Sequence, residues 1–165
     1  MKLITLLTII ISSINWVIAP PPYRETITRS LQFSETSTEN ELWLKNIQGD
    51  ITVIGYDGET VEVSVEKTIS ARRQEKLQQG IDEIQLTTEL DGTVMLVYMD
   101  APFVDAHRKG NHFHYRTDRY DHDYNYRMDF TVRVPKSLNL KVSTVNDGTV
   151  VVENVQPESM EVHNV

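Results

Sequence analysis

The chain contains no cysteine among its 165 residues. This absence excludes disulfide bonds, thiolate metal sites and a lipidated N-terminal cysteine. A basic surplus is absent too, because 16 Lys and Arg stand against 24 Asp and Glu, for a formal net charge of −8. A nucleic-acid backbone needs a basic face, so we expect no nucleic-acid partner.

Catalytic signatures are also missing. The sequence has no GxSxG, HExxH, P-loop or GxGxxG pattern. We therefore expect a protein that is not an enzyme.

Long apolar runs are confined to the first 19 residues. Lys2 precedes an apolar stretch from Leu3 to Ile11, and residues 17–19 have the spacing of a signal-peptide cleavage site. Residues 1–19 are therefore predicted to be a signal peptide, or an N-terminal membrane anchor if Pro20 prevents cleavage after Ala19. Either alternative places the protein outside the cytoplasm: in the periplasm, on the cell surface or secreted.

The rest of the chain is predicted to be a short spacer and one β domain. Three consecutive prolines make residues 20–23 a stiff extended spacer, followed by a domain over residues 24–165. Apolar and polar residues alternate over 61–66 and over 120–134, the pattern of strands with one buried face. We expect Met128, Phe130, Val132 and Val134 to be buried. Ser70 is expected to cap the single helix, residues 71–79, which Gly80 would end.

A short β-rich phrase recurs along the chain. Val142-Ser-Thr-Val145 returns 20 residues later at 162–165, and an upstream copy is Leu44-Lys-Asn-Ile47. Such spacing, with Gly/Asn/Asp corners, is typical of stacked coils. The predicted fold class is all-β, a β-solenoid or β-roll with hairpins and one short helix. The domain is expected to be open or truncated at its C-terminus, so that its last edge strand favours self-association.

Three segments carry a resemblance to a known family: residues 46–68, 126–144 and 144–155. They resemble the bacterial putative-adhesin family, a domain of unknown function whose exported members form β-solenoids or β-rolls. The resemblance implies an exported, non-catalytic adhesin or cell-envelope scaffold, with a protein or glycan partner at the cell surface. It implies no functional residues, since the family has no established catalytic motif.

The sharpest candidate site is the His/Asp/Tyr-rich segment 105–126. His112 and His114 would lie on one face of a strand, and His122 and Asp121 could complete a metal site, most plausibly for zinc. The alternative for these histidines is a polar surface loop without metal. A metal- or ligand-binding envelope protein using this segment is the alternative to the adhesin function.

Aromatic residues and aspartates in the chain allow further interpretations. Tyr115 and Tyr120 are the candidates for a ligand-binding surface, whereas Tyr124 and Tyr126 are expected to continue the buried face of the strand. The Gly/Asp corners could suggest calcium, but glycine and aspartate suit tight corners on conformational grounds alone.

Overall fold

The structure, a computed structural model, describes residues 19–110, 112–117 and 122–164. Most of the predicted signal peptide or anchor lies outside these residues, as do Tyr120 and Asp121. In the described part of the chain, no helix is long and apolar enough to cross a membrane.

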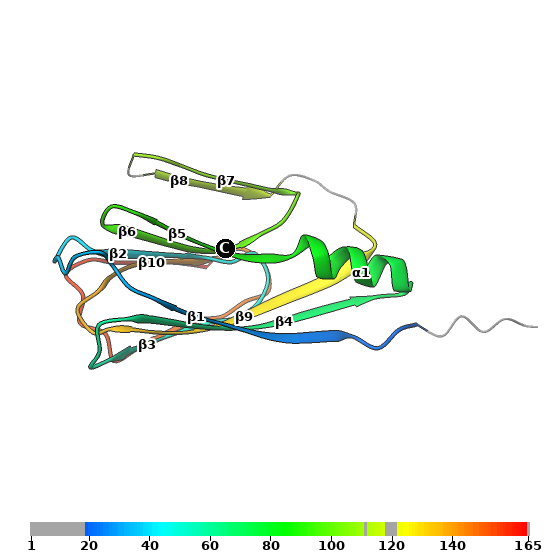
Figure 1. The fold of residues 1–165 in the computed structure, drawn as a ribbon, viewed down its shortest axis with the longest axis horizontal. Coiled ribbons are helices and arrows are strands. Elements are labelled where there is room, and N and C mark those ends of the chain that lie inside the picture. The colour runs from blue at the N-terminus through cyan, green and yellow to red at the C-terminus, as the bar shows by residue number, and fades with distance from the viewer. Residues whose placement is uncertain (1–18, 111, 118–121, 165) are drawn as a thin grey trace, which may run out of the picture.

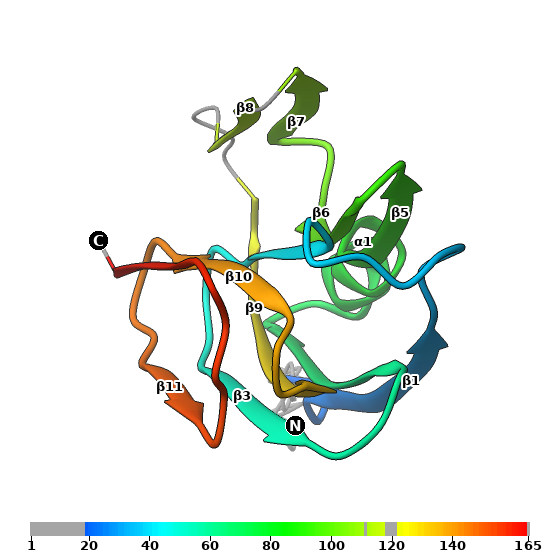
Figure 2. The same cartoon turned by 90° about the vertical axis from the view of Figure 1, so that its left-hand side faces the viewer.

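Two five-stranded sheets pack face to face (Figures 1 and 2). Sheet A has the order β1-β4-β9-β3-β11, made by Tyr23–Leu31, Val61–Ala71, Tyr124–Pro135, Ile51–Tyr56 and Val150–Glu153. Sheet B has the order β12-β10-β2-β6-β5, made by Met160–Asn164, Asn139–Thr144, Glu41–Lys45, Val94–Asp100 and Gln85–Asp91. A separate hairpin, β7 (Val104–Lys109) and β8 (His112–Thr117), lies above sheet B.

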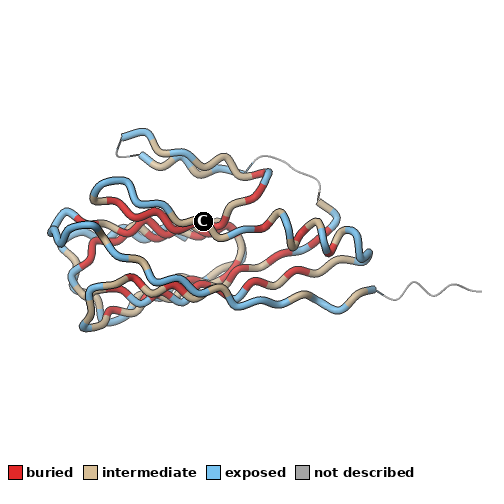
Figure 3. Tube along the Cα trace, viewed as in Figure 1, coloured by how far each residue is buried: buried red, intermediate tan, exposed pale blue. Residues whose placement is uncertain are grey.

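The main core lies between the two sheets (Figure 3). On β9, Met128, Phe130, Val132 and Val134 are at most 1% exposed, whereas the residues between them are half-buried or exposed. The predicted alternation is therefore confirmed. Tyr124 and Tyr126 continue the buried face, as expected.

The helix lies further along the chain than predicted. α1 spans Gln74–Glu83 with Arg73 as its N-cap, because β4 continues through Ser70 to Ala71. Gly80 does not end the helix but sits in its buried face. A Cβ there would lie 2.7 Å from the Ile69 side chain and 2.8 Å from the Tyr124 ring, so the glycine allows α1 to pack closely on β4 and β9.

The repeated phrase aligns in register within sheet B. β10 pairs in parallel with both β2 and β12, and Val142 lies beside Leu44 on one side and Val162 on the other. The predicted stacking of the 20-residue repeat as neighbouring parallel strands is thus confirmed. On β11, Val150 and Val152 are half-buried against the core and Glu153 is exposed.

The all-β class with one short helix is confirmed, but the structure does not show a β-solenoid. The chain passes between the sheets as coils only from β2 to β3 and from β9 through β12. Elsewhere it forms antiparallel pairs, β1 with β4, β4 with β9 and β5 with β6. The repeat therefore accounts for the parallel pairing of β10 with β2 and β12, while the other strands build a mixed two-sheet fold.

Candidate functional site

The β7–β8 hairpin covers half of the outer face of sheet B. Trp43, Leu96 and Tyr98 point outward from β2 and β6 and are at most 5% exposed. The hairpin residues that pack on them are Ala106, Phe113 and Tyr115. This second apolar layer explains why every residue of β6 except Asp100 is buried.

Tyr115, one of the two predicted ligand-binding tyrosines, is part of this packing. Its ring lies against Tyr98 and Phe113, and its hydroxyl donates to the Met99 carbonyl oxygen at 2.7 Å. Burial raises the pKa of the Tyr115 hydroxyl well above its usual value. Tyr115 is therefore placed to hold the hairpin on the sheet, and a ligand surface at Tyr115 and Tyr120 stays a prediction.

The outer face of the hairpin brings two histidines to one carboxylate. His107 and His114 are cross-strand partners, and their ring centroids are 4.8 Å apart. Asp105 Oδ1 lies 2.9 Å from His107 Nδ1, and Asp105 Oδ2 lies 3.5 Å from His114 Nε2. The hydrogen bond with His107 is the main reason that the pKa of Asp105 is lowered.

The other two predicted histidine ligands, His112 and His122, lie apart from this pair. His112 pairs with Lys109 at the tip of the hairpin. The His122 ring packs 5.2 Å from that of Phe103, just before the base of the hairpin, and its Nδ1 lies 2.7 Å from the Tyr124 carbonyl oxygen. Since strands rise about 3.3 Å per residue, the length of the hairpin separates His112 from His122.

No described group of three or more His, Asp or Glu residues has a geometry that could hold a metal ion. Asp121 lies outside the described residues. The site at His112, His114, His122 and Asp121 therefore stays a prediction. Sequence reasoning overlooked the pairing of His107 with His114, which the Gly-Asn dipeptide at 110–111, a hairpin signal in the sequence, could have indicated.

The Gly/Asp corner that might suggest calcium is occupied by the protein's own groups. Asp50 accepts hydrogen bonds from the Thr149 backbone N–H and from Arg127 Nη2, both at 2.7 Å. Its own backbone N–H donates to Asp129 Oδ1 at 2.8 Å. Asp50 thus joins the corner before β3 to β9 and to the start of β11.

A ladder of side-chain hydrogen bonds supports the successive corners. Asn46, fully buried, donates from Nδ2 to the Met128 carbonyl oxygen at 2.8 Å. Its counterparts in the stacked strands, Thr144 and Asn164, donate to the carbonyl oxygens of Gly49 and Gly148 at 3.3 and 3.0 Å. Each of these three side chains therefore donates a hydrogen bond to a main-chain carbonyl oxygen of the neighbouring stacked segment, and the series extends to β12.

The pair of sheets is open at β11 and β12. All five residues of β12 are exposed, and among the described strands β12 pairs only with β10. Met160 and Val162 continue the inner face of Leu140 and Val142 but are 52% and 41% exposed. This end combines a free strand edge with uncovered apolar side chains, the usual features of a protein-binding edge.

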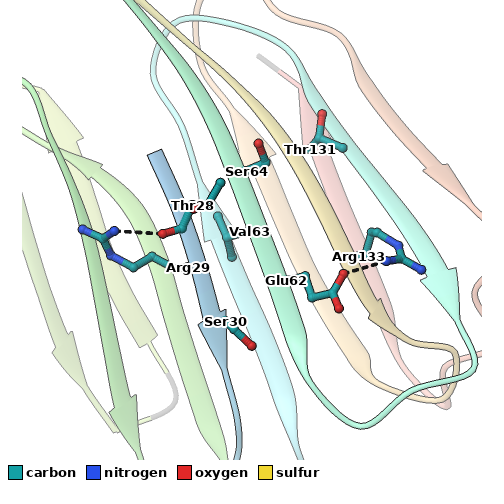
Figure 4. A pocket seen from close by; sticks show the side chains of 8 residues that line it. All are labelled: Thr28, Arg29, Ser30, Glu62, Val63, Ser64, Thr131 and Arg133. Atoms are coloured by element: carbon teal, nitrogen blue, oxygen red, sulfur yellow. Dashed lines mark hydrogen bonds and ion pairs between the residues drawn. The ribbon is translucent and has the colours of Figure 1, made fainter. Parts of the chain in front are cut away.

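Hollows also lie elsewhere on the described part of the molecule. A groove of about 340 Å³ lies beside edge strand β1 (Figure 4). Its charged groups are already engaged, with Arg133 Nη1 2.7 Å from Glu62 Oε2 and Arg29 Nη1 2.8 Å from the Thr28 carbonyl oxygen. A cleft of about 420 Å³ lies between the loops near Phe33, Gly58 and Leu138.

Comparisons with known proteins give likeness in structure only. No known protein family and no curated protein matches the sequence. A crystal structure named a putative cell adhesion protein, from Clostridium sporogenes, has a TM-score of 0.48 and 9% identity, over 86% of this chain and 57% of that one. A putative adhesin from Bacteroides fragilis has a TM-score of 0.31 and 12% identity, over 84% of this chain and 56% of that one.

A third structure, named a putative lipid binding protein from Parabacteroides distasonis, has a TM-score of 0.36 and 18% identity. It matches 77% of this chain and 40% of that one. This chain thus spans between two and three fifths of the length of these proteins. Two of the three names are those of adhesion proteins, but identities and scores this low leave the function to be argued from the chain's own residues.

Proposed function

We propose that this protein is an exported, non-enzymatic binding domain, an adhesin or a scaffold of the cell envelope. Its binding surface is the open end formed by β11 and β12. The observation that carries this proposal is the exposure of Met160 and Val162 beside a strand edge that no described strand occupies. Such an edge gives a partner strand main-chain hydrogen bonds, and the apolar side chains add contact area.

The test of the binding role is retention of protein-coated beads on intact bacterial cells and on purified cell walls. Wild-type beads are expected to be retained. A Met160→Lys/Val162→Lys variant is expected to lose retention, because the charges make the apolar face unsuitable for contact. A matched variant, Leu90→Lys, changes another exposed apolar residue, on β5, and should behave as wild type. Equal retention of all three kinds of bead, or retention no greater than that of albumin-coated beads, would contradict the proposal.

Export rests on the sequence of residues 1–19 and has its own test. Fusion of residues 1–23 to a reporter enzyme that is active only outside the cytoplasm should give activity in a bacterial host. A Leu6→Arg/Leu7→Arg change breaks the apolar run and should abolish that activity. Activity that is absent from both fusions would remove export from the proposal.

The second candidate function is metal binding by the hairpin. His107 and His114 both approach the carboxylate of Asp105, although these three residues by themselves do not have the geometry of a metal site. Imidazole and carboxylate are ordinary zinc ligands, and zinc is the ion expected from the sequence. A zinc-dependent rise in melting temperature tests this candidate, and the variants are described with the predictions below.

A further inference from the structure

The free edge of β12 has a defined set of outward-facing backbone groups. The Leu140 N–H donates to the Ser159 carbonyl oxygen at 3.1 Å, and Leu140 is the register partner of Met160. In parallel pairing the N–H and C=O groups of successive residues point alternately to the two sides. Ser159, Glu161 and His163 therefore turn these groups toward β10, while Met160, Val162 and Asn164 turn theirs toward the free edge.

The side chains of β12 divide with the same alternation. Met160 and Val162 lie on the inner face, next to Leu140 and Val142. Glu161 and His163 lie on the outer face and contact each other, with His163 Nε2 2.6 Å from Glu161 Oε1. The strand thus carries an acidic and a basic group two residues apart on one face and apolar groups on the other.

We propose that two copies of the chain pair through their β12 strands, antiparallel and about a two-fold axis at Val162. This rests on the proposed binding role of the open end and names its partner. The outward backbone groups of Met160, Val162 and Asn164 would then meet those of Asn164, Val162 and Met160 of the second copy. An interface of this kind is isologous, the commonest arrangement of protein dimers.

The charges on the outer face select this register. With Val162 opposite Val162, Glu161 of each copy lies opposite His163 of the other, in the pairs whose side chains come closest. Two shifted registers also match the outward backbone groups. One sets Glu161 opposite Glu161, which places like charges together, and the other sets His163 opposite His163, which removes both Glu161–His163 contacts. Lys141 lies beside Glu161 in register within each copy and adds favourable charge to each arrangement.

The inner face also favours a second copy of the same end. Met160 and Val162 are exposed, and Val150, Val152 and Val155 are half-buried at the same end of the sheets. The second copy presents the same apolar set, so each set would cover the other. The two B sheets would then form one continuous sheet across the axis.

A charge-exchange experiment tests both the partner and the register. Purified wild-type protein is expected to be a dimer by sedimentation equilibrium. Glu161→Lys alone sets Lys opposite His163, and His163→Glu alone sets Glu opposite Glu161. Each should weaken dimerisation at least tenfold. An equimolar mixture of the two variants sets the introduced lysine opposite the introduced glutamate and keeps Glu161 opposite His163 at the other contact. It should give a mixed dimer of one copy each, seen by native mass spectrometry.

A matched control and a second measurement guard against unfolding of β12. Glu66→Lys makes the same charge change at an exposed position of β4 and should leave the dimer intact. Because the chain has no cysteine, Val162→Cys creates a single thiol on the proposed axis. Directly opposed residues lie about 5.5 Å apart between Cα atoms, within disulfide range, so this variant should cross-link to itself on oxidation. Val151→Cys, exposed on β11, should not.

Monomeric wild-type protein at about 100 μM, dimers that persist in both charge variants, or Val162→Cys that does not cross-link would overturn the proposal. These results are distinguishable from failure of the binding role. Beads that are retained on cells while the protein stays monomeric would keep the open end as a binding site but assign it another partner. A dimer whose beads are not retained would keep the pairing and remove the adhesive role.

Discussion

The covered and open halves of sheet B differ although they are built from one repeated pattern. Leu44, Val142 and Val162 occupy one register row on the inner face, and their exposed fractions are 0%, 1% and 41%. On the outer face the matching row is Trp43, Lys141 and Glu161. Exposure increases along this row, because the Trp43 indole is buried beneath the hairpin and the Glu161 carboxylate is exposed. In sheet B, a residue's register position thus determines which face its side chain occupies, while its neighbours determine how much that side chain contributes to stability.

The largest expected effect comes from shortening the first and the last side chain of the inner-face row, Leu44 and Val162. Leu44→Ala removes a fully buried side chain and should lower the unfolding free energy by about 2–5 kcal/mol. Val162→Ala removes one that is already partly in water and should cost less than about 1 kcal/mol in dilute protein. Urea unfolding of both variants measures the difference, and equal losses would show that the open end is as well packed as the covered half.

A somewhat smaller difference is expected within the corner ladder. Asn46→Ala leaves the buried carbonyl oxygen of Met128 and the backbone N–H of Ile47 without the partners that Asn46 provides, at a cost of roughly 2–4 kcal/mol. Asn164→Ala loses an exposed hydrogen bond to the Gly148 carbonyl oxygen and should cost less than about 1 kcal/mol. Thermal unfolding of the two variants checks this, and a larger loss for Asn164→Ala would mean that β12 is held more tightly than its exposure indicates.

Alkaline pH should lower the unfolding free energy through three tyrosines: Tyr98 and Tyr115 in the layer between sheet B and the hairpin, and Tyr126 on β9. Burial raises the pKa of Tyr98, Tyr115 and Tyr126, the last to about 12. Below pH 10 these tyrosines are protonated in both the folded and the unfolded state, so their contribution to the unfolding free energy is complete. As pH rises from 10 through the folded-state pKa, the unfolded state loses the proton first, and each such tyrosine costs about 1.4 kcal/mol per pH unit.

Two lysines oppose this trend. Burial lowers the pKa of Lys45 and of Lys67, so their contributions to stability increase as pH rises from the folded-state pKa toward 10.5. Above pH 10.5 this opposing contribution is complete, so the three tyrosines should still give a net loss of unfolding free energy toward pH 12, followed by urea unfolding. Tyr115→Phe should make the loss less steep, and an unchanged slope would argue against burial of this hydroxyl.

The smallest expected effect concerns zinc at the hairpin. If the second candidate function holds, zinc should raise the melting temperature of the wild-type protein, and His107→Ala/His114→Ala should abolish the rise. His112→Ala is the matched control, because His112 lies at the hairpin tip and should leave the rise intact. A rise that depends on His112 and not on His107 would instead support the metal site expected from the sequence.

Local periodicity predicted much of this fold because it depends on neighbouring residues. The alternation from Met128 to Val134 identified the buried face of β9, and the 20-residue repeat identified the register of β10 with β12. The overall class was more difficult, because antiparallel pairing of β1, β4 and β9 joins segments far apart in the chain. A repeat seen at three places therefore indicated a solenoid, although the intervening strands build a mixed fold.

The candidate sites were less predictable for a related reason. Tyr115 belongs to a strand whose inner face is covered only because the hairpin folds over Trp43 and Tyr98, a contact between distant segments. His107 and His114 meet because the register of β7 with β8 makes them cross-strand partners. His122 lies near Phe103 and not near this pair. Residue types suggested the chemistry, but only the folded hairpin determined which side chains meet.

The corner between β10 and β11 contains one residue more than its counterpart between β2 and β3. Val142 pairs with Leu44, a separation of 98 residues, whereas Val150 pairs with Ile51, a separation of 99. The extra residue is accommodated at Asp147, which has a positive φ of 42°. Had it entered the strand, Val150 and Val152 would have turned outward, because a slip of one residue exchanges the two faces. The corner thus absorbs a change in chain length, so that two strands of unequal connection stay in register in both sheets.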